Sequence, residues 1–386
     1  MDGASWAHSV TTATSSITDM RMAWPFLIRF LNGFINELII MNEINYNSRI
    51  GKLRSRYNPD GNRLYEERVY SETAGLVSDT QKYVRMAMMA VDEDYTRKTK
   101  LAGEAAKEHL KKELSDVDYR YQGSVMTDTH IKGASDIDLL VLCTKFNHTD
   151  ISRVRDELNN SSSHSYIELV NLMSYNERFS AYQGNCYQDL RSLRLDIERI
   201  MKSHYVVCDT SKPKSVKITN QNLHRDVDVV TSCWYDTYSY VLHGECEADR
   251  AISIYNKDTN RDIGPDYPFL SISRINSKSA STNGRLKRMI RFLKNVRYDS
   301  NRVIDLTSFE INAICYDMPI REYQDKDYKE LVSFLWRKMY HLWKDDKVEQ
   351  LTSVAGNEFV FKGKPDKVEA LKLLEDEVYR ISCDLK

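Results

Sequence analysis

The chain has 386 residues, of which 41% are hydrophobic and 29% are charged, with a formal net charge of −1. This composition is ordinary for a globular protein and provides enough chain for a sizeable core. The near-neutral charge excludes a protein that coats a nucleic-acid duplex, because such proteins carry a large positive excess. The seven cysteines form no C-x-x-C or Cys/His cluster, so neither a zinc site nor a disulfide framework is predicted.

The N-terminal part of the chain predicts a loose start followed by helices. Residues 1–18 are rich in Ser, Thr and Ala, and apolar residues then recur on one helical face between Phe26 and Met41. Polar residues interrupt this stretch, which is also too short to span a bilayer. A second helical region is predicted over about 72–114. Without a secretory signal, we expect a cytoplasmic protein with no membrane attachment.

The middle of the chain predicts strands alternating with helices. Residues 118–125 predict a short strand ending at a Gly-Ser pair, and residues 136–144 (DIDLLVLCT) predict a strongly apolar strand. Helices are predicted over about 150–180 and 186–204. Further strands are predicted at 204–209, 214–219 and 225–234.

The C-terminal part predicts a helical lobe. Residues 256–283 contain two prolines near a glycine together with many Ser and Asn, which indicates a long loop at the boundary between lobes. Helices are predicted after it, at about 284–298, 307–317, 321–344 and 365–383. We therefore expect an α+β protein with an N-terminal helical extension, a catalytic lobe containing a mixed sheet, and a helical nucleotide-binding lobe, at 1–100, 101–255 and 256–386.

Three acidic residues carry the strongest chemical signal. Asp136 and Asp138 stand two apart at the start of an apolar strand, so both side chains project from one face. A neighbouring strand can bring Asp228 alongside, but Asp226 lies on the same face and strand alternation does not separate the two. Converging carboxylates repel each other, and their hard oxygens suit Mg²⁺ or Mn²⁺. Two such ions ~4 Å apart can activate an attacking hydroxyl and stabilise leaving pyrophosphate.

A Gly-Ser pair precedes the first two acids, with eleven residues between Ser124 and Asp136. Gly123 allows the backbone to approach a phosphate closely, and the Ser124 hydroxyl and nearby amides can bind its oxygens. Either motif alone is weak, since most Gly-Ser pairs are turns and short acidic motifs are common. Their combination favours a nucleotide site, because a surface ion-pair role does not explain two acids at the entry of a buried strand.

A basic helix is predicted at residues 284–297 (GRLKRMIRFLKNVR). Its apolar residues make a core face, and Lys287, Arg291 and Lys294 form a basic stripe beside that face. Basic faces are usually solvated, but like charges one turn apart repel each other. An anionic partner such as a triphosphate is therefore expected.

These motifs together resemble the DNA-polymerase-β-like nucleotidyltransferase superfamily. Within it, the chain is similar to the bacterial cGAS/DncV-like cyclic-oligonucleotide synthases, relatives of cyclic GMP-AMP synthase and oligoadenylate synthase that act in anti-phage defence. The resemblance covers roughly residues 100–320 and is strongest in three blocks. These are YQGSVMTDTHIKGASDIDLLVL (121–142), RDVDVVTS (225–232) and DYPFLSISRINSKSASTNGRLKRMIRFLKNVRYDS with LTSFEINAICY (266–316).

The resemblance implies a polymerase-β-like lobe with a mixed sheet beside a C-terminal helical lobe, with the active site in the cleft between them. It implies that Asp136 and Asp138 hold both metal ions. The third acid of the family usually lies in an acid-Val-Val-Pro strand, which matches Asp228 in DVVT, with Thr231 in place of proline. Two Mg²⁺ ions are the implied cofactors, and Mn²⁺ can substitute for them.

Several further residues are implied to contact substrate. Ser124 matches the serine that contacts the triphosphate, next to Gly123. A lysine of the helical lobe grips the triphosphate in the family, and Lys287 and Lys294 are both candidates, with Arg291 between them. Ser308 and Phe309 stand where the family has a Ser-Tyr pair that binds phosphate and stacks on a base, so the stacking surface is kept without its hydroxyl.

The implied function is the condensation of nucleoside triphosphates into a cyclic di- or oligonucleotide second messenger, with release of pyrophosphate. The product would act on a separate effector protein, and a regulatory protein partner is compatible with the sequence. The zinc-binding insertion of the animal DNA sensor is absent, as is a long basic surface, so activation by double-stranded DNA is not expected. The sequence does not reveal which bases are joined.

Two alternatives are considered. A non-cyclising oligoadenylate- or RNA-end-type nucleotidyltransferase would have to hold RNA, and the chain shows no RNA-recognition signature. An inactive nucleotide-binding module would not need the complete set of Gly-Ser pair and three acids, although a fold alone does not fix a function.

Overall fold

The structure is a computed structural model that describes residues 43–56, 63–133, 136–160 and 163–385. The chain separates into two units, Met1–Tyr46 and Asn47–Lys386, and the sheet and helices that carry the site lie in the second. The predicted loose start and the predicted helix between Phe26 and Met41 lie outside the described residues. Among the described helices, none is both long and apolar enough to cross a membrane.

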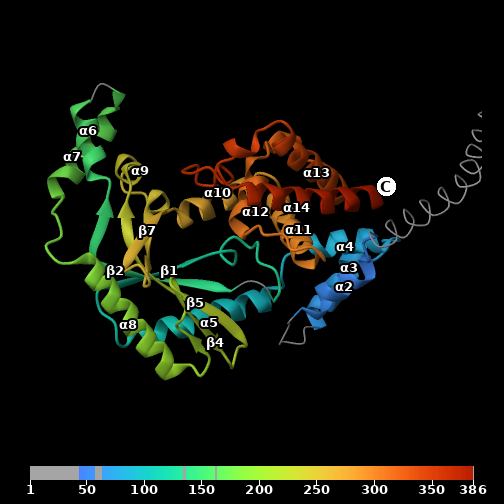
Figure 1. The fold of residues 1–386 in the computed structure, drawn as a ribbon, viewed down its shortest axis with the longest axis horizontal. Coiled ribbons are helices and arrows are strands. Elements are labelled where there is room, and N and C mark those ends of the chain that lie inside the picture. The colour runs from blue at the N-terminus through green and yellow to red at the C-terminus, as the bar shows by residue number, and fades with distance from the viewer. Residues whose placement is uncertain (1–42, 57–62, 134–135, 161–162, 386) are drawn as a thin grey trace, which may run out of the picture. The chain divides into compact units, whose positions relative to one another are not determined.

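Seven strands among the described residues form one mixed sheet (Figure 1). They are β1 (Val117–Gln122), β2 (Ile137–Thr149), β3 (Cys208–Asp209), β4 (Ser215–Asn220), β5 (Arg225–Asp236), β6 (Ala251–Asn256) and β7 (Arg261–Asp266). The strand order is β1-β2-β5-β4-β3, with β6 pairing with the C-terminal part of β5 and β7 pairing with β6. β2 and β5 are parallel, and the other neighbouring strands are antiparallel. The predicted mixed sheet is therefore confirmed.

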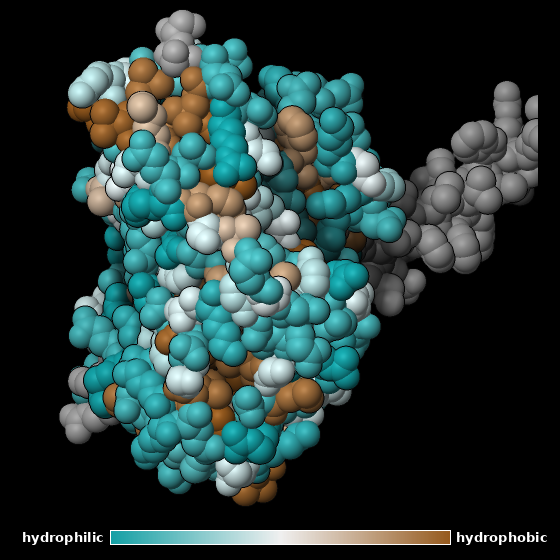
Figure 2. All heavy atoms as spheres, turned by 90° about the vertical axis from the view of Figure 1, so that its left-hand side faces the viewer, coloured by the Kyte–Doolittle hydropathy of each residue, from teal (hydrophilic) through white to brown (hydrophobic). Residues whose placement is uncertain are grey.

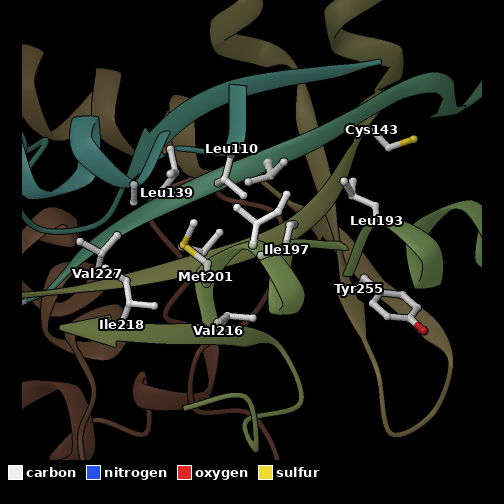
Figure 3. Packing of buried hydrophobic residues seen from close by; sticks show 14 of the residues in the cluster. Leu110, Leu139, Cys143, Leu193, Ile197, Met201, Val216, Ile218, Val227 and Tyr255 are labelled. Atoms are coloured by element: carbon white, nitrogen blue, oxygen red, sulfur yellow. The ribbon is translucent and has the colours of Figure 1, made fainter. Parts of the chain in front are cut away.

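β2 and β5 lie at the centre because their apolar residues are buried on both faces of the sheet. On one face, Leu139 packs into a core cluster with α5 (Glu93–Lys111) and α8 (Cys186–His204), as Figure 3 shows. On the other face, Leu140 packs into a smaller cluster that includes Trp234. Layers on both sides fix the strands rigidly, so the polar residues at their N-terminal ends are held by a packed core.

Three helices pack at the opposite end of the central strands. They are α6 (Ile151–Asn159), α7 (Tyr166–Arg178) and α9 (Tyr238–Leu242), which share a small buried cluster around Leu172. The outer side of α7 leaves several large apolar side chains exposed: Tyr166, Ile167, Val170 and Met173. Figure 2 shows a mostly hydrophilic face with hydrophobic residues gathered at this end, at the top of the view, and in a second area in its lower half.

The remaining helices form a separate layer beside the sheet (Figure 1). From the C-terminal part they are α10 (Pro268–Ala280), α11 (Arg285–Asp299), α12 (Ser308–Asp317), α13 (Tyr328–Lys344) and α14 (Pro365–Asp384). Short 3-10 helices lie at Glu247–Asp249, Ile320–Glu322 and Val348–Gln350. From the N-terminal part, α2 (Tyr46–Ser55), α3 (Arg63–Thr73) and α4 (Asp79–Met88) join them, since α4 packs against both α11 and α13.

Buried polar contacts tie these N-terminal helices to the C-terminal ones. Arg56, directly after α2, donates to Asp299 at the end of α11 at 2.6 Å, and the hydroxyl of Tyr83 on α4 donates to the same carboxylate at 3.1 Å. Arg49 on α2 pairs with Glu377 on α14, and both side chains are less than 8% exposed. Because breaking a buried pair leaves an unpaired charge, these contacts specify how the two ends of the described chain pack.

One predicted segment is wrong. Residues 256–283, expected to be a long loop, form the β6–β7 turn, strand β7 and helix α10. Pro268 occupies the first turn of α10, where its missing N–H costs nothing, and the serine- and asparagine-rich sequence is helical because Ile275 and Ser279 are buried against its neighbours. The sheet therefore continues to Asp266 and the helical lobe begins at α10.

Candidate active site

The three predicted acids meet at the N-terminal ends of the two parallel central strands. Asp138 on β2 lies in register with Asp228 on β5, so the two are direct neighbours across the parallel ladder. Neighbouring strands lie about 4.8 Å apart, and paired residues point to the same face. Asp136 precedes Asp138 by two residues and shares that face. The structure thus brings together the three carboxylates that the sequence singled out.

The Asp138 carboxyl lies among other negative charges. Burial, together with the nearby negative charges of Asp228 and Asp136, raises its pKa to about 7. A carboxyl whose pKa is raised by neighbouring carboxylates marks a place where negative charges are crowded together. The donor set, oxygen ligands on a rigid strand pair, fits a hard divalent cation.

Gly123 lies directly against this carboxyl. It follows β1, whose last residue Gln122 pairs with Asp138, and its φ of +89° is in the left-handed region that favours glycine. A Cβ on Gly123 would lie 2.6 Å from Oδ2 of Asp138. The backbone at Gly123 therefore closely approaches the Asp138 carboxylate, and no larger residue fits without moving the acid. The predicted approach of this backbone to a phosphate stays a prediction.

The turn after Gly123 is held by its own backbone. The carbonyl of Ser124 accepts from the amide of Thr129 at 3.0 Å and from the Thr127 hydroxyl at 3.2 Å. Ser124 itself is half-buried, and its hydroxyl has no hydrogen-bond partner within the described ranges. The serine that is predicted to contact a phosphate thus sits on a hydrogen-bonded turn, and none of the described residues binds its hydroxyl.

Basic side chains on β4 and in the loop before it lie beside the acids, and sequence reasoning missed them. Lys212 contacts Oδ1 of Asp228 at 3.4 Å, and the Ser215 hydroxyl donates to the same oxygen at 3.1 Å. On β4, Lys217 lies 2.6 Å from Oδ2 of Asp136. The alternation in SVKITN predicted this strand, but only the strand pairing places its polar side chains beside the acids.

Asp226, the rival for the third acidic position, has a different set of partners. It accepts from the Thr219 hydroxyl at 2.7 Å and pairs with Lys217 at 3.0 Å. Burial lowers the pKa of Lys217, but its hydrogen bonds to Asp136 and Asp226 outweigh this effect and the pKa is raised. Asp228, not Asp226, is in register with Asp138, which supports the choice of Asp228.

The three residues of the predicted basic stripe on α11 have different surroundings in the structure. Arg291 is 6% exposed and donates to the carbonyl of Asp128 at 2.6 Å, and Lys294 is 2% exposed and donates to the carbonyl of Thr129 at 3.1 Å. Burial lowers the pKa of Lys294 to about 7. These two cations bind the turn that carries Ser124, so the interpretation of a stripe facing an anionic ligand does not fit them.

Lys287 differs from its two neighbours on the helix. It is half-buried, and it makes no hydrogen bond or ion pair with the residues that the structure describes. Burial lowers its pKa, and the nearby Asp128 opposes that effect. Of the two lysine candidates for the triphosphate, this arrangement favours Lys287 over Lys294.

Ser308 and Phe309 open helix α12. Thr307 caps this helix and forms a reciprocal capping box with Glu310, which fixes its first turn. The Phe309 side chain is 40% exposed, so an aromatic surface is available at this end of the helix. The predicted stacking role is compatible with this exposure and stays a prediction.

The fold and the acidic cluster define a nucleotidyltransferase of the polymerase-β-like class. The C-terminal helical domain of cGAS/DncV-like nucleotidyltransferases matches residues 273–380. A c-di-GMP synthase from Lachnospiraceae bacterium (strain RUG226) is 57% identical over 345 residues, which cover 89% of this chain and 100% of that protein.

Solved structures agree. A STING-associated CdnE c-di-GMP synthase from Flavobacteriaceae sp. matches with a TM-score of 0.79 and 35% identity, covering 89% of this chain and 99% of the other. A second, from Capnocytophaga granulosa, matches with a TM-score of 0.73 and 38% identity over the same shares. The chain belongs to the cGAS/DncV-like nucleotidyltransferase family. The predicted family and fold are thus confirmed, as is the predicted synthase of a cyclic di- or oligonucleotide, for which these relatives support a cyclic dinucleotide.

Proposed function

We propose that this enzyme condenses two molecules of GTP into cyclic di-GMP with release of two pyrophosphates. The product follows from the relatives described as c-di-GMP synthases, which this chain matches over nearly all of their length. The observation that carries the reaction is the register of Asp138 with Asp228, which puts two carboxylates side by side next to Asp136.

We assign Asp136, Asp138 and Asp228 as ligands of two Mg²⁺ ions, which Mn²⁺ can replace. The raised pKa of Asp138 and the confined oxygens around it support a divalent cation at this position. Such ions lower the pKa of an attacking hydroxyl and stabilise the charge on the departing pyrophosphate. The remaining contacts with the substrate come from residues of the chain itself.

Four residues are proposed to position the substrate. Gly123 leaves room for the carboxylate of Asp138, and the Ser124 hydroxyl donates to the oxygens of a phosphate. Lys287 supplies a positive charge for the triphosphate, and Phe309 offers a face for a guanine base. Because phosphoryl transfer depends mainly on positioning and charge stabilisation, these contacts are expected to carry much of the rate.

The reaction consists of two equivalent displacements. In each, a ribose hydroxyl oxygen forms a bond to an α-phosphorus, the bond from that phosphorus to the bridging oxygen breaks, and pyrophosphate departs. We assign Asp228 to the activation of the attacking hydroxyl. The first displacement gives a linear dinucleotide, and the second closes the ring.

We further propose that the product acts on a separate effector protein in anti-phage signalling within the cytoplasm. The support is that two solved relatives are described as STING-associated. Activation by double-stranded DNA is not part of this proposal, because the chain has no large positive excess.

The test is incubation of purified protein with GTP alone, and with all four ribonucleoside triphosphates, in Mg²⁺ or Mn²⁺. Products are treated with phosphatase and resolved by mass spectrometry. A phosphatase-resistant species at the mass of cyclic di-GMP from GTP alone is expected. A different cyclic mass would refute the choice of base, and only linear products would favour a non-cyclising nucleotidyltransferase.

Variants test the assigned acids. The double variant Asp136→Ala/Asp138→Ala should remain folded and make no product, and synthesis by this folded variant would refute the metal assignment. Asp228→Asn and Asp226→Asn form a matched pair, since both acids lie on one face of β5. Asp228→Asn should lose at least about a hundredfold in rate, as expected for loss of a charge-stabilising group, and Asp226→Asn far less.

A further inference from the structure

Lys217 occupies the place where a cation would bind Asp136. It lies on β4 directly across from Asp228, so its side chain shares a face with the acids. Its ammonium is 2.6 Å from Oδ2 of Asp136 and 3.0 Å from Oδ2 of Asp226. One ammonium group therefore bridges a predicted metal ligand and an acid that is not in register with Asp138.

These contacts conflict with a metal at the same oxygen. A Mg²⁺ ligand oxygen lies about 2.1 Å from the ion, and an ammonium at hydrogen-bond distance from that oxygen would bring two positive groups close together. The side chains of Lys217, Asp136 and Asp226 are 28%, 33% and 34% exposed, so the group is neither fixed by deep burial nor fully solvated. The lysine can therefore exchange one carboxylate for another.

We propose that Lys217 is the counter-cation of Asp136 in the metal-free enzyme and that it transfers to Asp226 alone when a divalent ion binds. This inference rests on the metal site of the proposed function. Asp226 then has a defined task, because it retains the displaced ammonium within the site. Lys217 and Asp226 act through Asp136 on metal binding and are thus positioning residues.

Lys212 is a poorer candidate for this task. Its contact with Asp228 is longer, at 3.4 Å, and its side chain is 42% exposed. Lys212 also has no second carboxylate among the ion pairs of the described residues, whereas Lys217 has one 3.0 Å away. Of these two lysines, Lys217 is the one that can leave a predicted metal ligand and remain paired.

The first test measures Mn²⁺ binding to the full-length protein without nucleotide, from the electron paramagnetic resonance signal of the free ion. Lys217→Met removes the competing cation, so Mn²⁺ should bind about tenfold more tightly, and the thermal shift caused by Mn²⁺ should grow. Lys217→Gln should give the same sign and serves if the Met variant folds poorly. Unchanged or weaker Mn²⁺ binding in folded Lys217 variants would overturn the proposal.

A matched control is available in the helical lobe. Lys338 pairs with Glu322 at 2.6 Å, with side chains 33% and 35% exposed, which closely matches the Lys217–Asp136 pair. Lys338→Met should leave the Mn²⁺ affinity unchanged. An equal gain in affinity in this variant would show that loss of any lysine charge accounts for the effect, and the proposal would fail.

The second test asks whether Asp226 acts through the lysine. Asp226→Asn removes the resting partner, so Lys217 stays on Asp136 and Mn²⁺ binding should weaken. In the Lys217→Met background the same change should have a much smaller effect, because no ammonium remains to be held. Equal effects in both backgrounds would mean that Asp226 only supplies negative charge, and would overturn the transfer.

The two proposals fail in different ways. If the wild type and the Asp136→Ala/Asp138→Ala variant bind Mn²⁺ equally, the metal site itself is wrong and both proposals fall. If the wild type binds Mn²⁺ and Asp136→Ala/Asp138→Ala does not, the proposed metal site stands. If Lys217→Met then binds Mn²⁺ no more tightly than the wild type, the role of Lys217 is refuted.

Discussion

Gly123→Ala should lower the rate of catalysis strongly while the protein stays folded. The new Cβ would lie 2.6 Å from Oδ2 of Asp138, whereas ordinary contacts begin at 3.4 Å, so the carboxylate must move by about 0.8 Å. A misplacement of about 1 Å can cost roughly a hundredfold in rate. The φ of +89° adds about 1–2 kcal/mol of backbone strain. We expect a folded protein with about one hundredth of the wild-type rate.

Gly75→Ala is the matched control. Gly75 has a φ of +79°, and no atom lies within 4 Å of the position that a Cβ would take, so alanine there introduces strain without contact. Urea unfolding should show similar losses of stability for both variants, and only Gly123→Ala should lose synthesis of the cyclic product. The reasoning is refuted if Gly123→Ala keeps more than about a third of the wild-type rate, or if Gly75→Ala loses as much.

Two further predictions concern buried and half-buried basic side chains. Burial lowers the pKa of His130 to about 4 from 6.5, so the unfolded chain binds a proton first as the pH falls, and stability is lost between pH 6.5 and 4. This pH-dependent loss of unfolding free energy is at most about 3 kcal/mol, and it should be missing from His130→Gln in urea unfolding. The same dependence of stability on pH in the variant and the wild type would contradict the prediction. Lys287→Ala should raise KM for GTP at unchanged stability, whereas Lys294→Ala should cost about 1–3 kcal/mol because the Thr129 carbonyl loses its donor. Equal stability of these two variants would refute the distinction.

Sequence alternation was sufficient to place Asp136 and Asp138 on one face, because that inference needs only the geometry of a single strand. It could not choose between Asp226 and Asp228, since that choice depends on the register between β2 and β5. Register depends on how the hydrophobic patterns of two paired strands pack together, and the sequence of one strand alone does not give it. The contact of Lys217 with the acids depends on strand pairing in the same way.

The helical pattern of α11 was predicted, but the partners of its cations were not. A helical wheel identifies Arg291 and Lys294 as neighbours of the core face, yet both are buried because carbonyls of the Ser124 turn accept their hydrogen bonds. Such carbonyls carry no signature in the sequence. Likewise, residues 256–283 have the composition of a loop, and only tertiary packing makes part of them a strand and a helix.

The pairing of Arg49 with Glu377 has a consequence for the order of events during translation. The two residues are 328 positions apart, and the helix that carries Arg49 leaves the ribosome long before α14 is made. The sheet between Val117 and Asp266 can assemble in that interval, since its core is drawn from that region and from α5. Arg49 must meanwhile remain hydrated, because burying it without its partner is costly. The catalytic sheet of a nascent chain can therefore be complete while its helical layer is still unfinished.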